Sequence, residues 1–411
     1  MLKTLKNTDF LKLWLGQLIS RIGDGIHEIA LAWLVLELTG SALSMGAILA
    51  VSILPNLLFG LPAGVIVDRF NRKRIMVLSD LSRTLIVLVI PVAYSLGFLR
   101  IWMIFLAAFL TSTAEAFAGP ARLSSIPNLV EEKNLDPANS LIQITRSVSS
   151  LFGLSLGGAV VATIGPANSF ILDSASFFLS TVFISLINYG PVSREGIEDL
   201  YSDIAVKIKG GLHYVMNDPF IKQLIVIAAG LNFVMAPINV ILPFFIKEVL
   251  GLTAIVYGTM MACLSVGTFA GSMIIGNVTV HRGKSLGSGI LGIGASLVAF
   301  SVVFMVSQNF LLPTLITIAI LSATLVGVGA GSSFTNVPII TLLQRTTEDS
   351  KRGRVMSLVN MGAMAAMPVA YGITGFLLEQ LGAIPLILAI GSLTLIGSTA
   401  CFRSREIMAA N

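Results

Sequence analysis

Charged residues are scarce in this chain. Only 11% of its 411 residues are Asp, Glu, Lys or Arg, whereas 55% are hydrophobic, and the mean hydropathy is +0.90. Soluble domains carry about 25% charged residues, so this deficit excludes a soluble globular protein. Apolar stretches of about 20 residues, the length needed to cross a bilayer, recur from one end of the chain to the other. The sequence therefore predicts an all-α membrane protein.

Cysteine and histidine are also rare. The two cysteines, Cys263 and Cys401, lie in separate apolar stretches, and the three histidines lie in separate regions of the chain. Such spacing provides neither a disulfide framework nor a Cys/His metal site. We therefore expect no metal ion and no cofactor.

Two enzyme motifs are each broken at one position. Residues 283–285 read Gly-Lys-Ser, as at the end of a phosphate-binding loop, but Val278 stands where the first glycine is required. His27-Glu28 begins a zinc-protease motif, but Leu31 replaces the second histidine. The sequence thus favours a protein that is not an enzyme.

Charge and turn clusters divide the chain into twelve predicted transmembrane spans. They are approximately 10–38, 42–67, 75–97, 101–119, 138–164, 168–189, 219–248, 253–279, 286–307, 310–338, 355–380 and 383–402.

The connections between these spans alternate in charge. One set is short and nearly uncharged, whereas the other includes basic segments such as 69–74 and 281–284. Basic connections stay in the cytoplasm, so we expect both termini there and a multi-pass protein of the cell inner membrane. Because this topology explains the sequence pI of about 9.3, no nucleic-acid partner is predicted.

The longest connection, 190–218, separates an N-terminal half, 1–189, from a C-terminal half, 219–411, with six spans each. Its apolar residues recur at helical spacing, which predicts an amphipathic helix at the membrane surface. Each half also places a glycine and a basic turn between its second and third spans, at 64–73 and 276–284. This pattern suggests an internal repeat, and duplicated halves around a central cavity are a common transporter architecture.

The first span contains an unusual set of ionisable residues. Arg21, Asp24 and Glu28 are spaced three and four apart, so they share one helix face. A charged side chain within the membrane costs at least about 2.5–3.5 kcal/mol unless it faces water or a partner. We predict that Asp24 and Glu28 line a cavity. The alternative is an Arg21–Asp24 ion pair that only joins helices.

Two further ionisable residues lie in the N-terminal half. Glu115 in span 4 and Arg146 in span 5 could form a pair, and the sequence leaves open whether its role is structural or functional. Spans 7–12 carry charged residues only near their ends. Charge chemistry is therefore expected in the N-terminal half.

The end of span 2 and the start of span 3 form a further candidate site. Glycine allows close helix approach, and a carboxylate beside cations can form a network that breaks when helices separate. We interpret this set as a cytoplasmic gate, formed by Gly64, Asp68, Arg69, Arg72, Lys73, Asp80 and Arg83. A second set, Gly153, Gly157 and Gly158 in span 5, predicts tight helix packing.

Together these residues resemble the major facilitator superfamily. The 64–73 segment looks like the loop motif between helices 2 and 3 of that superfamily, and 149–158 is similar to its antiporter motif in helix 5. The usual arginine of helix 4 is Thr111 here. Across nearly the whole chain the likeness is to the drug:proton antiporter branch of macrolide-efflux proteins and the enterobactin exporter. Segments that carry this likeness are Gly16–Asp24, Thr39–Ser41, Gly119–Arg122, Ala138–Ser140, Asp173–Phe177 and Arg352–Val355.

The resemblance implies the major facilitator fold and secondary export of amphipathic drugs or metabolites by alternating access. Macrolide-like compounds are favoured as the small-molecule substrate, with protons as the exchanged ion and a monomeric protein in the bilayer. Alternatives are a siderophore exporter, a lysolipid transporter, and a non-transporting scaffold or sensor. By itself, the Asp24 and Glu28 pair argues against an anionic cargo, and Glu28 is the expected proton carrier because Arg21 lies closer to Asp24.

Overall fold

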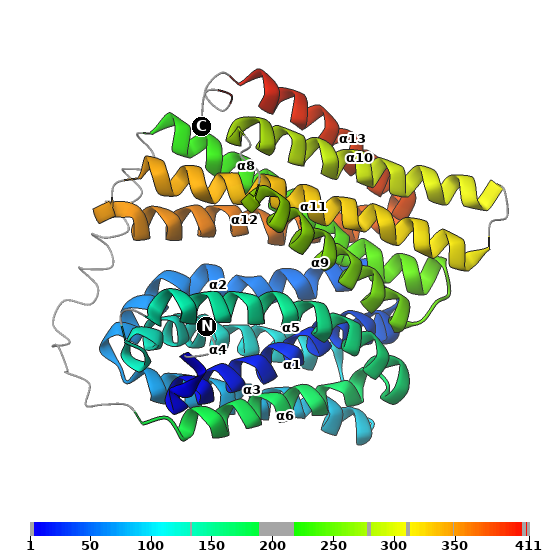
Figure 1. Cartoon of the computed structure of the whole chain (residues 1–411). Helices are drawn as coiled ribbons and strands as arrows, with labels where there is room; N and C mark the ends of the chain where they lie inside the picture. The colour runs from blue at the N-terminus through cyan, green and yellow to red at the C-terminus, as the bar shows by residue number, and fades with distance from the viewer. Residues whose placement is uncertain are drawn as a thin grey trace. The chain divides into compact units, whose positions relative to one another are not determined.

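A computed structural model describes residues 4–131, 134–188, 218–277, 281–309, 313–347, 349–404 and 408. Helices account for nearly all of these residues (Figure 1). A short helix, η1 (Thr4–Lys6), precedes the long ones. The N-terminal helices are α1 (Thr8–Thr39), α2 (Ala42–Arg69), α3 (Arg72–Ser95), α4 (Ile101–Leu129), α5 (Leu135–Ile164) and α6 (Pro166–Ser185). The C-terminal helices are α8 (Pro219–Phe244) with its π-helical extension η3 (Phe245–Val249), α9 (Ala254–Asn277), α10 (Arg282–Asn309), α11 (Thr314–Thr346), α12 (Asp349–Leu381) and α13 (Ala383–Arg403).

In this described part of the chain, eleven helices are long and apolar enough to cross a membrane. The remaining long helix, α1, has 32 residues but carries Arg21, Asp24 and Glu28 in its interior. Composition alone therefore excludes α1 from the eleven, although its length exceeds the roughly 20 residues that a span requires. With α1 included, the helices match the twelve predicted spans.

The chain forms two compact units. One contains Met1–Gly40 and Ile48–Val206, and the other contains Ser41–Ala47 and Lys207–Asn411. The start of α2 thus groups with the second unit. The predicted amphipathic helix in 190–218 lies almost entirely outside the described residues.

The boundaries of α1 follow from local chemistry. At its start, the side chain of Asn7 accepts hydrogen bonds from the backbone amides of Asp9 and Phe10, both at 3.0 Å. At its end, Gly40 has φ +60°, a left-handed conformation that glycine adopts without strain. The amide of Gly40 donates to the carbonyl of Leu36, which satisfies one of the last carbonyls of the helix.

Two predicted connections were wrong in part. The predicted spans 101–119 and 138–164 leave 120–137 as a connection, but α4 continues through Pro120 and Pro127 to Leu129. Likewise α11 runs to Thr346, beyond the predicted end of its span at 338, and α12 begins at Asp349, before the predicted start of its span at 355. A helix inside the membrane tolerates proline because neighbouring groups satisfy the freed carbonyls. Gly119-Pro120 therefore does not end α4.

In the first unit, α1 packs closely against α5 through glycine. A Cβ atom at Gly25 would lie 2.6 Å from the carbonyl carbon of Gly153 and 2.9 Å from the amide nitrogen of Leu154. A Cβ at Gly157 would lie 3.0 Å from the carbonyl oxygen of Gly25. Gly153 and Gly157 of the predicted packing set thus face α1, and Gly158 is buried beside them.

We expect Gly25→Ala to lower the free energy of unfolding by about 1–3 kcal/mol, as overpacking of a filled core does. Carbon atoms pack at about 3.5–4.0 Å, so the new methyl group would force α1 and α5 apart. Thermal unfolding in detergent measures the effect. Gly60→Ala in α2, where a Cβ meets nothing within 4 Å, is the control. Equal unfolding temperatures for the two variants would show that the α1–α5 contact is not tight.

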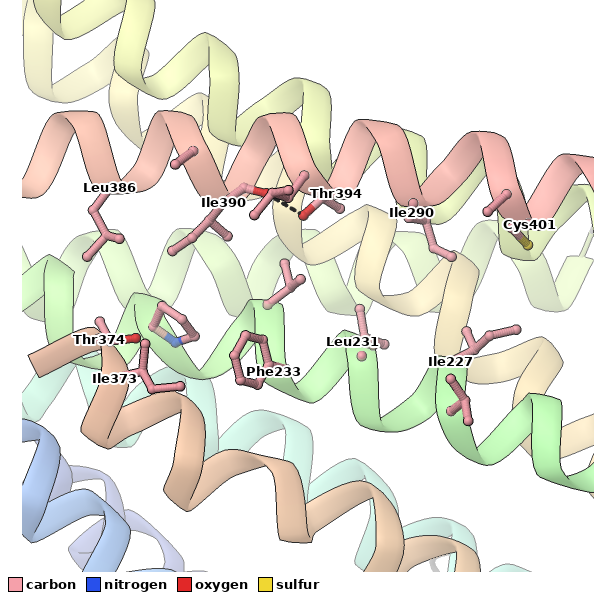
Figure 2. A pocket seen from close by; sticks show the side chains of 18 of the residues that line it. Ile227, Leu231, Phe233, Ile290, Ile373, Thr374, Leu386, Ile390, Thr394 and Cys401 are labelled. Atoms are coloured by element: carbon pink, nitrogen blue, oxygen red, sulfur yellow. Dashed lines mark hydrogen bonds between the residues drawn. The ribbon is translucent and has the colours of Figure 1, made fainter. Parts of the chain in front are cut away.

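The second unit combines close glycine contacts with one long cavity. A Cβ at Gly271 in α9 would lie 2.8 Å from the carbonyl oxygen of Ala330 in α11. By contrast, α8, α12 and α13 surround an apolar cavity of about 540 Å³, shown in Figure 2. A Cβ at Gly294 of α10 would lie 2.8 Å from the amide nitrogen of Leu395, so α13 packs closely against α10, whereas a space separates much of α13 from α8.

Candidate charged site

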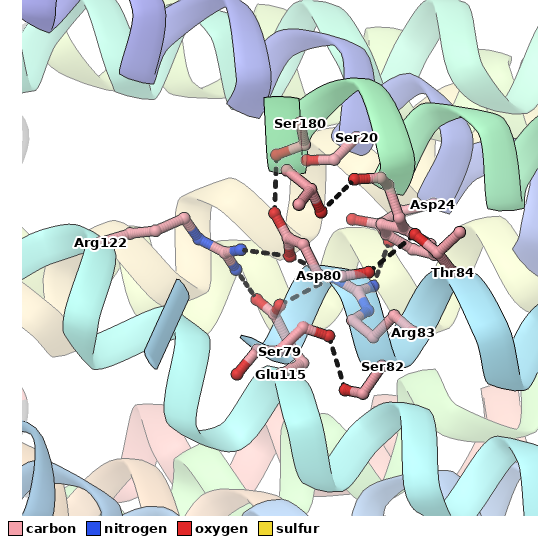
Figure 3. Close-up of polar contacts among 12 residues, drawn as sticks. Ser20, Asp24, Ser79, Asp80, Ser82, Arg83, Thr84, Glu115, Arg122 and Ser180 are labelled. Carbon is pink, nitrogen blue, oxygen red and sulfur yellow. Dashed lines mark hydrogen bonds and ion pairs between the residues drawn. The ribbon is translucent and has the colours of Figure 1, made fainter. Parts of the chain in front are cut away.

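Arg83 of α3 lies at the centre of a charged cluster in the first unit (Figure 3). Its Nη2 donates to Oδ1 of Asp24 at 2.6 Å, and its Nη1 donates to Oε2 of Glu115 at 3.0 Å. The guanidinium carbon also lies 3.7 Å from the centre of the Phe177 ring, a cation–π arrangement. One side chain thus joins α1, α3, α4 and α6.

A second guanidinium completes the cluster. Arg122 of α4 donates to Glu115, and its Nη1 lies 3.9 Å from Oδ1 of Asp80. The fully buried Asp80 accepts a hydrogen bond of 2.7 Å from the hydroxyl of Ser180 in α6. Arg83 Nη1 is 4.0 Å from the same Oδ1 of Asp80. Distances of 3.9 and 4.0 Å are too long for hydrogen bonds, so these two attractions are electrostatic.

The cluster is partly open to its surroundings. Arg83 and Arg122 are 5% and 6% exposed, whereas the side chains of Asp24 and Glu115 are 36% and 30% exposed. Two guanidinium groups face three carboxylates, and Arg21 of α1 lies close enough to attract Asp24 and Glu115 electrostatically. A buried charge without a partner is costly, and three arginines can balance the three carboxylates.

A separate polar contact lies one turn along α1. Nδ1 of His27 is 2.6 Å from Oδ2 of the fully buried Asp173 in α6, and the imidazole meets the Phe170 ring edge-on at 5.1 Å. Glu28, the next residue, is exposed, and among the described contacts it has no hydrogen bond or ion pair. The two predicted carboxylates of α1 therefore differ, because Asp24 is engaged and Glu28 is accessible.

The structure gives Asp24 and Glu115 other partners than the two pairs considered from the sequence. Asp24 contacts Arg83 rather than Arg21, and Glu115 contacts Arg83 and Arg122 rather than Arg146. Arg146 itself is exposed in α5. Spacing along one helix favoured Arg21 for Asp24, but the guanidinium that reaches it comes from another helix.

The residues of the predicted gate divide into two groups. Asp80 and Arg83 lie well inside α3 and belong to the charged cluster. At the start of α3, Arg72 donates a hydrogen bond to the carbonyl of Ser124 at 2.7 Å. Lys73 donates one to the carbonyl of Ile187, also at 2.7 Å. A Cβ at Gly64 would meet nothing within 4 Å, and Nη1 of Arg69 is buried. The side chain of Asp68 lies outside the described structure.

Three residues of these polar contacts were not predicted as partners from the sequence. They are Arg122, Asp173 and His27. Arg122 falls between the predicted spans 101–119 and 138–164, and Asp173 is a single acidic residue in an apolar span. An isolated carboxylate within a span is itself a signal, since such a residue needs a partner or water. The described carboxylates and guanidinium groups that are buried, Asp80, Arg83, Arg122 and Asp173, all lie in the first unit.

Comparison with known proteins gives a consistent result over the full length. The family model described as transmembrane secretion effector matches residues 1–410. The chain is 27% identical over 419 residues to the multidrug efflux pump Tap of Mycolicibacterium fortuitum, with 98% of each chain covered. It is 24% identical over 400 residues to macrolide efflux protein A of Streptococcus pyogenes, covering 97% of this chain and 96% of that protein.

A solved structure supports the architecture. The nucleoside transporter NupG superimposes with a TM-score of 0.74 at 10% sequence identity, covering 96% of this chain and 100% of that one. At this identity the match concerns the fold alone.

Proposed function

Because the chain belongs to the transmembrane secretion effector family of major facilitator transporters, we propose that it exports amphipathic drugs or metabolites from the cell. It is a multi-pass membrane transporter and not an enzyme. Macrolide-like compounds are the first candidates for its cargo, since relatives that align over nearly the whole chain are named for macrolide and multidrug efflux. We further propose that inward movement of protons drives this export, and that the protein acts as a monomer.

The observation that carries the proposal is that the two carboxylates of α1, Asp24 and Glu28, have different surroundings. Asp24 is held by Arg83 at 2.6 Å, whereas Glu28, one turn further, is exposed. An accessible carboxylate within a membrane-spanning helix is suited to take up and release a proton. The side chain of Asp24, which is engaged by Arg83 but partly exposed, instead contacts cationic parts of a cargo.

The proposal is tested in everted membrane vesicles from a strain that lacks its own efflux pumps. We expect vesicles containing the protein to accumulate a radiolabelled macrolide when a pH gradient is imposed, and to lose the accumulation when a protonophore collapses the gradient. Vesicles containing Asp24→Asn should accumulate less of a cationic macrolide, with Glu37→Gln on the exposed end of the same helix as control. Accumulation equal to that of vesicles without the protein, for a panel of amphipathic drugs, would contradict an export function.

We also expect both termini to face the cytoplasm, because the basic connections do so in membrane proteins. A single cysteine at Ser41 should then react with an impermeant maleimide added to intact cells, whereas one at Ser350 should not. Labelling uses a background in which Cys263 and Cys401 are replaced. Labelling at 350 from outside, without labelling at 41, would invert the topology.

A further inference from the structure

The cavity in the second unit is a groove that follows the helices for most of their length. Its lining residues run from Leu386 of α13 to Ser404, the residue that caps this helix, and on α8 from Gln223 to Pro237. Ser404 comes eighteen positions after Leu386, which at about 1.5 Å per residue is roughly 27 Å, close to the ~30 Å thickness of the hydrocarbon core. Figure 2 shows side chains of α8 and α13 pointing into the space between the two helices.

The corresponding position in the first unit is filled. There the first and sixth spans, α1 and α6, are in direct contact, and a Cβ at Gly16 would lie 3.2 Å from the hydroxyl oxygen of Ser180. In the second unit the first and sixth spans are α8 and α13, and the groove lies between them. Cβ atoms at Gly230 of α8 and Gly397 of α13, both in the groove lining, would meet nothing within 4 Å. The repeat therefore leaves a space in one half that side chains occupy in the other.

The groove is apolar along its length but polar at one end. Val226, Phe233 and Leu393 line it and are 69%, 40% and 66% exposed, so its wall is accessible from outside the second unit. At the end of the groove, Nε2 of Gln223 donates to the hydroxyl of Ser404 at 3.2 Å. The Oε1 atom of Gln223 is buried, and no hydrogen-bond donor reaches it among the described residues.

Cationic residues flank this polar end. Lys222 precedes Gln223 on α8 and Arg403 precedes Ser404 on α13, and both are exposed. An anionic head group at this level would meet two positive charges, and a hydroxyl group on it would supply the donor that Gln223 Oε1 lacks. The volume of about 540 Å³ falls within the roughly 300–1,000 Å³ typical of sites for small ligands.

We propose that the groove between α8 and α13 binds one anionic phospholipid, with an acyl chain along the apolar wall and its phosphate between Lys222 and Arg403. Phosphatidylglycerol has both required features, because its head group combines a negative phosphate with free hydroxyl groups. The bound lipid completes the packing of the second unit and occupies a place distinct from the charged cluster of the first. This site is independent of the nature of the transported cargo.

The test uses native mass spectrometry of the full chain, purified in detergent and titrated with phosphatidylglycerol or phosphatidylcholine. We expect the wild-type protein to retain one phosphatidylglycerol molecule and to prefer it over phosphatidylcholine, which has no negative net charge and no donor. Gly230→Leu combined with Gly397→Leu should fill the groove and weaken retention by about tenfold or more. Since leucine favours helix formation over glycine and both positions are open, these variants should fold.

Gly276→Leu is the matched control, because Gly276 lies in α9 outside the groove and also has open space at its Cβ position. It should retain phosphatidylglycerol as the wild type does. Lys222→Gln with Arg403→Gln should remove the preference for phosphatidylglycerol while leaving acyl-chain binding. Thermal unfolding confirms that each variant is folded, and the single variants Gly230→Leu and Gly397→Leu replace the double variant if it is not.

Three results would overturn the proposal. Unchanged lipid retention when the groove is filled would show that the retained lipid lies elsewhere. Equal retention of the two lipids by the wild type would remove the head-group assignment. A lipid-free dimer that dissociates on Gly230→Leu with Gly397→Leu would show that the groove is an interface between two copies of the chain.

Discussion

Replacement of Arg83 by glutamine is expected to abolish transport and to lower the free energy of unfolding by about 2–3 kcal/mol. Breaking a buried ion pair costs about 3–5 kcal/mol, and the lower figure applies because Asp24 and Glu115 are about one-third exposed. The substitution removes both short ion pairs of Arg83 and its contact with Phe177. Thermal unfolding and vesicle uptake measure the two effects.

Three control variants distinguish the effect of removing any positive charge from the effect of breaking the contacts of Arg83. Arg74→Gln, at an exposed position at the start of the same helix, should change neither stability nor uptake. Arg83→Lys should fold but transport poorly, because one ammonium group does not reproduce the forked contacts of a guanidinium. Adding Asp24→Asn to Arg83→Gln should restore part of the stability without restoring transport. Full transport by Arg83→Gln would show that the cluster is dispensable.

The second large effect is expected at Glu28. Glu28→Gln should eliminate the dependence of uptake on a pH gradient and retain drug binding, since glutamine keeps the shape of the side chain but does not exchange a proton. Glu115, which was the alternative carboxylate, already accepts hydrogen bonds from two arginines, whereas Glu28 is exposed. Gradient-driven uptake in everted vesicles and drug binding in detergent measure the two properties.

Glu37→Gln is the matched control for this prediction, because Glu37 is also exposed on α1 but lies near its end. It should leave gradient-driven uptake unchanged. Undiminished gradient-driven uptake by Glu28→Gln would assign proton coupling to another group, and the next variant to test is then Glu115→Gln.

The fold could be predicted from the sequence because each span carries its own signal. An apolar stretch of sufficient length forms a helix in a membrane whatever its neighbours are, since its backbone groups must be paired internally. Even α1 was found, because its apolar residues continue on both sides of Asp24 and Glu28. Boundaries were less accurate where proline lies inside a helix, as at Pro120.

The partners within the charged site could not be predicted in the same way. Asp24 and Arg83 are 59 positions apart in the chain, and no spacing rule connects residues on different helices. Spacing suggested Arg21 instead, because residues three apart on one helix are neighbours. Single ionisable residues in a span indicate that a partner exists, but only the packing of α1, α3, α4 and α6 identifies it.

The charges on α1 also bear on how the protein enters the membrane. Each of Arg21, Asp24 and Glu28 opposes insertion by about 2.5–3.5 kcal/mol, whereas each apolar side chain favours it by only about 0.3–0.6 kcal/mol. By itself, α1 is therefore a weak insertion signal. Arg83, which pairs with Asp24, is synthesised only with α3. Arg122, which pairs with Glu115, is synthesised with α4. Stable integration of α1 must consequently wait for helices that are made after it, so the biogenesis of the first half is a cooperative event.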